Sequence, residues 1–160
     1  MADPVVIATW PFGQTAVKKA LPALEAGKPA LDAALAGAEA VEDDPSVSSV
    51  GYGGLANAIG VVQLDACVMD GKTLNCGGVA GLTNVRHAAA VARRVMEKTP
   101  HVLLVGEGAK LFAVQQGFPL ETLTTPESVA EWEKKRPGAK PRDKDDHDTV
   151  TVLALDRKGN

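Results

Sequence analysis

The sequence predicts an α/β fold, and three observations support this class. Short apolar runs rich in β-branched residues alternate with segments in which apolar residues recur every three or four positions, the period of a helix. Hydrophobic residues make up 45% of the 160 residues and charged residues 23%, which is ordinary for a globular protein. Aromatic residues make up only 4%, so we expect a core of small aliphatic side chains between closely packed helices and sheets.

The N-terminal segment predicts a buried strand followed by a helix. Residues 5–8 form a short β-prone run, and Pro11 and Gly13 after it indicate a turn. Residues 14–26 carry apolar side chains on one helical face. Pro22 lies within this pattern. Because proline lacks an N–H and clashes with the preceding turn, it predicts a kink or a broken segment.

The next segment predicts a second helix and then a long loop. Gly27 ends the first helix, since glycine readily adopts the left-handed conformation found after helix C-termini. Residues 30–41 are rich in alanine, which has the highest helix propensity and suits tight packing. Residues 46–60 are rich in glycine and serine and therefore predict a loop.

The central part predicts a hairpin and a helix. Residues 61–69 resemble a strand, and the Asp-Gly pair at 70–71 is a strong hairpin signal. The partner strand is expected over residues 74–82, where three glycines add flexibility. Residues 88–98 then show the helical period and end before Pro100.

The C-terminal third predicts two strands, two helices and a linker. Residues 101–105 predict a short buried strand, and residues 107–116 and 126–135 predict helices, the second of them weakly. Residues 131–148 carry balanced charges with almost nothing to bury, so they predict a mobile linker. The β-branched run at 149–155 is typical of a central strand.

Charge and composition exclude several classes of function. The net charge is −3 and no basic face is sustained, which argues against nucleic acid as a partner. No apolar run approaches the roughly 18–20 residues that a membrane span needs. The first residues lack the pattern of a signal peptide, so the cytoplasm is the default compartment, with a periplasmic or lysosomal-type origin left open. Cys67 and Cys76 are too few for a disulfide scaffold or a zinc site, and whether they pair is left open.

Two motifs that suggest a cofactor have simpler interpretations. The turn Gly106-Glu107-Gly108 lacks the third glycine of a dinucleotide fingerprint, because Leu111 stands there. Glu107 would also place a carboxylate where a phosphate docks, so the turn is interpreted as structural. The acidic run at 143–148 lacks the spacing of a calcium loop and is interpreted as a solvated charge run. We therefore expect neither a metal nor a cofactor.

The other polar candidates are weaker. The glycine-rich loop at 51–54 is interpreted as a flexible surface turn in preference to an active-site loop. His87 and His101 have no evident catalytic partners and are expected to be capping or surface histidines. Trp10 lies at the end of a predicted strand and could belong to the core or form a substrate platform.

The most suggestive feature is the junction between Asp148 and Thr149. A threonine hydroxyl is a weak nucleophile unless a base lies beside it. An N-terminal threonine supplies its own base, because a free α-amine has a reference pKa of about 7.7–8.0. A cut before Thr149 would create that amine, and a mobile linker would let the released end withdraw. The alternative is a threonine that merely begins a strand.

Several groups of residues together are specific enough to indicate a family. They are Ala8-Thr9-Trp10-Pro11-Phe12, Asp43-Asp44-Pro45-Ser46-Val47, Ser49-Val50-Gly51-Tyr52-Gly53-Gly54, Leu64-Asp65-Ala66-Cys67-Val68-Met69-Asp70-Gly71, Ala90-Val91-Ala92-Arg93-Arg94-Val95-Met96-Glu97, His101-Val102-Leu103-Leu104-Val105-Gly106-Glu107-Gly108-Ala109, His147-Asp148-Thr149-Val150, Leu155-Asp156 and Gly159-Asn160. In this order they resemble the glycosylasparaginases (N4-(β-N-acetylglucosaminyl)-L-asparaginases, or aspartylglucosaminidases). That group belongs to the N-terminal-nucleophile hydrolases and to the asparaginase/isoaspartyl peptidase superfamily.

The resemblance implies an αββα sandwich and an N-terminal threonine amidohydrolase. It implies self-cleavage between Asp148 and Thr149, after which Thr149 attacks the side-chain amide of an asparagine derivative. The expected substrates are small glycosyl-asparagines or β-aspartyl amides. By the same match, Trp10 and Phe12 line the site, and Ser49 helps to hold the strained precursor.

The resemblance also divides the chain into three regions. Residues 1–130 correspond to the α-subunit, 131–148 to the linker that ends at the cut, and 149–160 to the start of the β-subunit. The family's second threonine, its substrate-gripping Arg and Asp and its oxyanion donors would lie beyond residue 160. We therefore expect an uncut, truncated precursor that is inactive alone, with an apolar sheet face exposed.

Two alternatives remain at this stage. The first is a plant-type asparaginase or isoaspartyl peptidase, although that group usually has glycine before its threonine. The second is a non-catalytic fragment that acts only by association, as a homo-oligomer or with a missing β-subunit.

Overall fold

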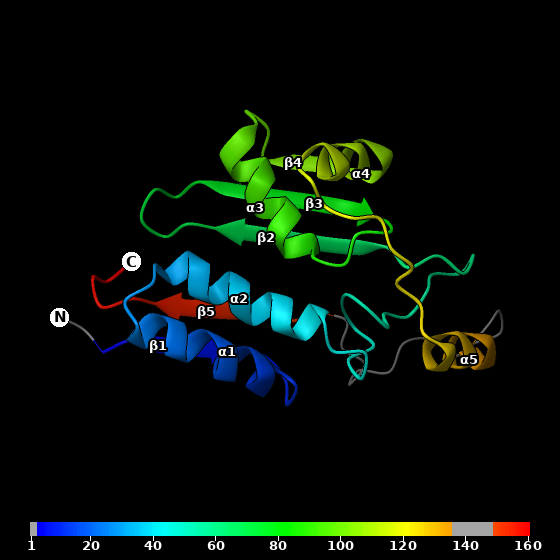
Figure 1. Cartoon of the computed structure of the whole chain (residues 1–160), viewed down its shortest axis with the longest axis horizontal. Helices are drawn as coiled ribbons and strands as arrows, with labels where there is room; N and C mark the ends of the chain where they lie inside the picture. Colours follow the sequence, from blue (N-terminus) through cyan, green and yellow to red (C-terminus); the bar gives the residue numbers. More distant parts are fainter. Residues whose placement is uncertain (1–2, 136–148) are drawn as a thin grey trace.

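The computed structural model describes residues 3–135 and 149–160 and confirms the α/β class. The strands form two separate sheets, one antiparallel and one mixed (Figure 1). The first sheet consists of β1 (Val5–Ala8) and β5 (Val152–Leu155); the second has the order β2 (Leu64–Met69), β3 (Cys76–Leu82) and β4 (Leu103–Val105).

Five helices connect and cover these strands in the part of the chain that the structure describes. Each begins and ends within about two residues of the position that its apolar period predicts. They are α1 (Gly13–Glu25), α2 (Ala30–Glu42), α3 (Ala88–Lys98), α4 (Gly106–Gln115) and α5 (Pro126–Lys135).

Pro22 does not break α1, which runs unbroken through it. Pro22 and Lys18, whose carbonyl loses its amide donor, are both exposed, so water can hydrate that carbonyl. Gly27 ends the helix as predicted, with φ at 82°. The N–H of Lys28 donates to the carbonyl of Ala23 at 3.0 Å, which closes a Schellman motif.

Among the described residues, helices cover one face of the first sheet. The inward residues of β1 and β5 pack against small side chains of α1 and α2, including Ala16, Ala20 and Ala33. The opposite face presents four apolar side chains, with Ile7 60% and Leu153 61% exposed. The prediction that residues 5–8 form a buried strand is therefore wrong, because only alternate residues face the helices. The members of the exposed set are Val5, Ile7, Leu153 and Leu155.

The second sheet is built in the same way and carries the larger core. Val79 of β3 and Leu64 of β2 pack against α3 and α4 on one face. The other face exposes apolar and thiol side chains: Cys67, Met69, Cys76, Leu103 and Val105. The prediction of a buried strand over residues 101–105 is also wrong, since two of the three β4 residues are exposed.

β5 differs from the predicted central strand in extent and position. It begins at Val152, so Thr149 precedes the strand instead of opening it. Among the residues that the structure covers, β5 pairs only with β1. The hairpin of β2 and β3 is confirmed, although its connection is longer than a two-residue turn, with the N–H of Asp70 donating to the carbonyl of Asn75 at 2.9 Å.

The predicted linker lies mostly outside the described residues. Residues 131–135 form the second half of α5, and nothing in the structure addresses residues 136–148. Within the two described ranges, no helix is long and apolar enough to cross a membrane.

The contact between β3 and α3 gives a test of this packing. A Cβ at Gly77 would lie 2.6 Å from the backbone nitrogen of Met96 and closer still to the carbonyl oxygen of Ala92. We expect Gly77→Ala to lower the unfolding free energy by about 2 kcal/mol, because two backbones must separate. Gly71→Ala is the matched control, since nothing lies within 4 Å of its Cβ. Urea unfolding of both variants measures the difference, and equal stability would contradict the tight packing.

Candidate functional site

The pairing of β1 with β5 brings together segments from opposite ends of the chain. Ala8 lies opposite Val152 in the antiparallel register. One step further, the N–H of Thr9 donates to the carbonyl of Thr151 at 3.1 Å, and the N–H of Thr151 donates to Oγ1 of Thr9 at 2.9 Å. Three of the predicted site residues, Trp10, Phe12 and Thr149, lie within three positions of Thr9 or Thr151 in the sequence.

An apolar cluster next to this junction contains one predicted site residue and the immediate neighbours of two others. Its buried members are Ala16, Val41 and Val47. Phe12 packs against it, as do Val50, which follows Ser49, and Val150, which follows Thr149. Phe12 and the immediate neighbours of Ser49 and Thr149 therefore share one packing unit.

The side chain of Thr149 lies at the surface, and Ser49 is half-buried. Asp148, the other half of the predicted cut site, lies outside the described residues.

Trp10 occupies a strained position at the end of β1. Its φ is 65°, in the left-handed region that tryptophan rarely adopts, at a cost of about 1–2 kcal/mol. The N–H of Gly13 donates to its carbonyl at 3.0 Å and closes the turn into α1. Because Trp10 is 42% exposed, the core alternative for this residue is wrong, and part of the residue lies at the surface.

The glycine-rich loop is not the flexible surface turn that its composition suggested. Gly51 and Gly53 are buried and have φ values of 58° and 86°. The N–H of Tyr52 donates to the carbonyl of Glu42 at 2.8 Å, and the N–H of Gly53 donates to that of Leu123 at 2.7 Å. Glycine is required here because a Cβ at Gly51 would collide with the backbone of Glu42, and a Cβ at Gly53 would collide with that of Pro45.

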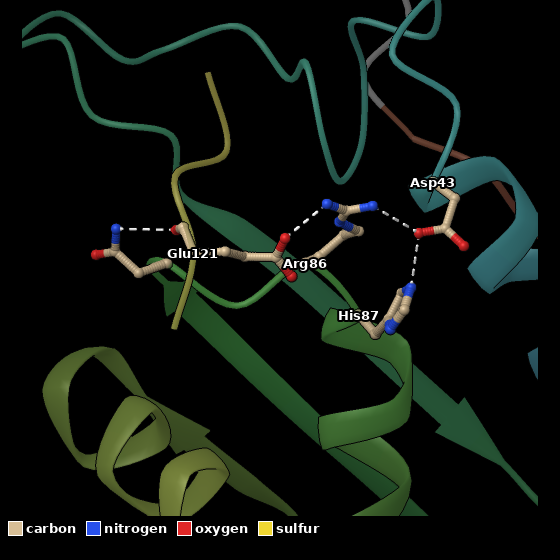
Figure 2. Close-up of polar contacts among 5 residues, drawn as sticks. Asp43, Arg86, His87 and Glu121 are labelled. Carbon is tan, nitrogen blue, oxygen red and sulfur yellow. Dashed lines mark hydrogen bonds and ion pairs between the residues drawn. The ribbon is translucent and has the colours of Figure 1, made fainter. Parts of the chain in front are cut away.

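A polar network lies next to this loop (Figure 2). The guanidinium of Arg86 donates to Asp43 at 3.2 Å and to Glu121 at 2.6 Å, and it lies over the Tyr52 ring, 4.6 Å from the centroid. His87 is bonded to Asp43 through Nε2 at 2.9 Å. Desolvation raises the pKa of Asp43, but the hydrogen bonds from His87 and Arg86 outweigh it and hold that pKa below its ordinary value.

Glu42 is the buried carboxyl group of this region and is 5% exposed. Its Oε1 accepts the N–H of Ala89 at 3.0 Å, which satisfies one free donor at the start of α3. Its Oε2 is buried and has no hydrogen-bond partner among the described residues. Burial raises the pKa of Glu42 to about 7, against the lowering effects of the Ala89 N–H and His87.

Sequence reasoning missed this network. His87 is at the N-cap position of α3, but its side chain makes no capping bond, and Glu42 caps the helix instead. Glu42 and Ala89 are 47 positions apart, so no local motif links them. His101 is exposed, as expected.

The remaining candidate residues have structural roles or lie outside the described residues. Gly106 has φ at 56° at the start of α4, and the carboxylate of Glu107 pairs with Lys110 at 2.6 Å. Cys67 and Cys76 are free and exposed. No group of three metal-ligating side chains occurs in residues 3–135 and 149–160, and the acidic run at 143–148 lies outside them.

Glu42 makes the stability depend on pH. Because the folded chain binds its proton more tightly than the unfolded chain, the unfolding free energy should fall as pH rises from 4.5 to about 7, by up to about 3 kcal/mol. Glu42→Gln keeps the acceptor but cannot ionise, so this loss should disappear.

Urea unfolding at pH 4.5, 6 and 8 measures this effect as the difference between wild type and variant. Glu39→Gln, one turn earlier on the same helix, is the matched control and should keep most of the wild-type slope, because the charge of Glu39 raises the pKa of Glu42 less than burial does. Parallel curves for wild type and Glu42→Gln would contradict the prediction.

Comparison with known proteins identifies the family that the chain matches. Residues 8–160 match the family model Asparaginase_2, described as asparaginase. An N(4)-(Beta-N-acetylglucosaminyl)-L-asparaginase of Elizabethkingia miricola is 48% identical over 98% of this chain and 47% of its own length. The corresponding enzyme of Rattus norvegicus is 42% identical over 79% of the chain and 36% of its own length. A plant-type L-asparaginase of Pyrococcus furiosus is 47% identical over 67% of the chain and 35% of its own length.

The chain thus spans less than half the length of these curated relatives. The family model, by contrast, covers nearly all of the chain, from the end of β1 through β5 to the last residue. The chain belongs to the asparaginase family.

Proposed function

We propose that the protein hydrolyses the side-chain amide of asparagine derivatives, with Thr149 as nucleophile. The substrates are N4-glycosyl-asparagines, and the products are aspartate and a glycosylamine. The observation that carries this proposal is the shared apolar cluster, in which Val150 beside Thr149 packs with Phe12 and with Val50 beside Ser49. A free N-terminal amine at Thr149 would lie at this junction.

Thr149 acts first on its own chain in this proposal. Its hydroxyl oxygen attacks the carbonyl carbon of Asp148, and the acyl group moves from nitrogen to oxygen. Water then hydrolyses the ester, which leaves Asp148 as a carboxylate and Thr149 with a free α-amine. That amine, with a reference pKa of about 7.7–8.0, accepts the hydroxyl proton in later turnovers.

The second reaction repeats this chemistry on a substrate. The Thr149 oxygen attacks the side-chain amide carbon, the C–N bond breaks and the amine leaves with a proton. Water hydrolyses the resulting β-aspartyl ester and releases aspartate. Trp10 and Phe12 line the site, and Ser49 helps to hold the strained precursor before the cut.

The finer architecture belongs to the same proposal. The complete fold is an αββα sandwich, to which this chain contributes the α-subunit part, the linker that ends at the cut site and the first β-subunit strand. The exposed apolar faces of both sheets support this, because a second sheet packed on them would remove Ile7, Leu153 and Met69 from water. In this proposal residues 1–160 alone are inactive and need a β-subunit, or a homo-oligomer, to complete the site.

A plant-type asparaginase or isoaspartyl peptidase is the second candidate, favoured by the Pyrococcus furiosus relative. The match to glycosylasparaginase extends over 98% of the chain, whereas the plant-type match covers 67%. Turnover of N4-glycosyl-asparagine in preference to L-asparagine and an isoaspartyl dipeptide would support the first candidate. The reverse preference would establish the second.

Thr149→Ala tests the nucleophile. We expect the longest chain encoded by the reading frame around these residues to cut itself before Thr149 and to release aspartate from a β-aspartyl amide. Thr149→Ala should abolish both, with a loss of at least about 10³-fold in rate. Thr151→Ala, two positions further on, is the matched control and should still be cut.

Intact-mass spectrometry follows the cut, and residues 1–160 alone, at 16.6 kDa, are measured in parallel. A persistent single species in the longer chain would contradict self-cleavage. Equal substrate turnover by wild type and Thr149→Ala would contradict the assignment of the nucleophile.

A further inference from the structure

Glu42 lies where the loop that carries Ser49 meets two helices. Its backbone carbonyl accepts the N–H of Tyr52 at 2.8 Å, while its side chain caps α3 through Ala89. The preceding residue, Val41, is completely buried in the cluster that includes Val150. The last turn of α2 therefore contacts the loop, α3 and the segment next to Thr149.

The last turn of α2 and the Ser49–Gly54 loop are in direct backbone contact. A Cβ at Gly51 would lie 2.6 Å from the carbonyl carbon of Glu42, so the two backbones touch. A displacement of the last turn of α2 must therefore move the Ser49–Gly54 loop with it.

The charged groups around Glu42 do not compensate its ionised form. Glu39 and Asp43 disfavour the charge from its own helix, and His87 favours it from the start of α3. The guanidinium of Arg86 is directed to Asp43 and Glu121, and its plane lies over Tyr52. With Oε2 buried and without a hydrogen-bond partner in the described part of the chain, ionisation places an incompletely satisfied charge inside the protein.

We propose that Glu42 is a positioning residue for the reaction at Thr149: protonated, it fixes the Ser49–Gly54 loop, and ionised, it loosens that loop. This inference rests on the proposed function for its effect on turnover, but its effect on the loop does not. The ionised form favours local opening, because water can then hydrate the buried carboxylate.

The consequence for the reaction is a pH profile limited from both sides. The acidic limb comes from the α-amine of Thr149, which must be unprotonated to act as a base, with a reference pKa of about 7.7–8.0. The alkaline limb comes from Glu42, whose pKa burial raises to about 7. Together they predict an optimum near neutral pH.

Hydrogen exchange tests the loop without any requirement for activity. The amide of Tyr52, corrected for its intrinsic rate, should lose protection on the order of 100-fold between pH 4.5 and 7 in wild type. In Glu42→Gln the loss should stay within about threefold, whereas Glu39→Gln should lose nearly as much protection as wild type. The same fall in wild type and Glu42→Gln would overturn the inference.

Turnover of a β-aspartyl amide tests the positioning role in the active, processed protein. We expect kcat of wild type to be bell-shaped with pH and that of Glu42→Gln to rise to a plateau. At pH 9 the variant should exceed wild type by about tenfold or more. An alkaline limb that persists unchanged in Glu42→Gln would overturn the inference.

The two arms separate this inference from the proposed function. If Thr149→Ala is as active as wild type, the nucleophile assignment fails, yet the exchange of Tyr52 still decides the role of Glu42. If Thr149→Ala is inactive and exchange does not respond to Glu42→Gln, only the positioning role fails.

Discussion

The pairing of β1 with β5 is the constraint on which the candidate site depends. Thr9 and Thr151 are 142 positions apart, and closing a chain of that length costs about 4 kcal/mol of entropy. Two strands of four residues cannot supply this alone, because an isolated two-stranded ribbon is marginal in water. The packing of α1 and α2 beneath them, with side chains as small as Ala16 and Ala33, has to stabilise the junction. The position of Thr149 relative to Phe12 is thus set by an apolar cluster, and the polar groups are added to it.

The polar groups beside this cluster have unequal partners. Asp43 and Arg86 form an ion pair that lies partly in water and contributes modestly to stability, while the Nε of Arg86 is buried without a hydrogen-bond partner among the described residues. Glu42, one residue earlier, is buried with a single donor. Adjacent carboxyl groups on one helix therefore titrate in different ranges, the pKa of Asp43 below its ordinary value and that of Glu42 near 7. Burial raises the pKa of Glu42, whereas at Asp43 the hydrogen bonds from His87 and Arg86 outweigh burial.

Much of the fold could be predicted from the sequence, and the failures share one cause. Helix limits follow from apolar period and from local residues such as Gly27, so α1 to α5 were predicted closely. The local apolar pattern did not show which strand faces stay exposed, because residues 5–8 and 103–105 are apolar on both faces. The family resemblance did imply an exposed apolar sheet face, since it placed the rest of the sandwich beyond residue 160. The candidate site could likewise be predicted only in part. Motifs indicated Trp10 and Thr149, whereas Glu42 capping Ala89 arises only from tertiary packing.

At position 10 the backbone conformation favours glycine, whereas the side chain present is that of tryptophan. Any residue with a Cβ is strained at the φ of Trp10, whereas glycine adopts it freely. Trp10 is 42% exposed, so more than half of its surface is removed from water, and this burial offsets the backbone strain at least in part. A substitution by glycine would relieve this strain, but it would also remove the indole that lies beside the junction of β1 and β5. In the proposed function Trp10 lines the site, so directed evolution for turnover would favour the indole regardless of the effect of glycine on thermal tolerance.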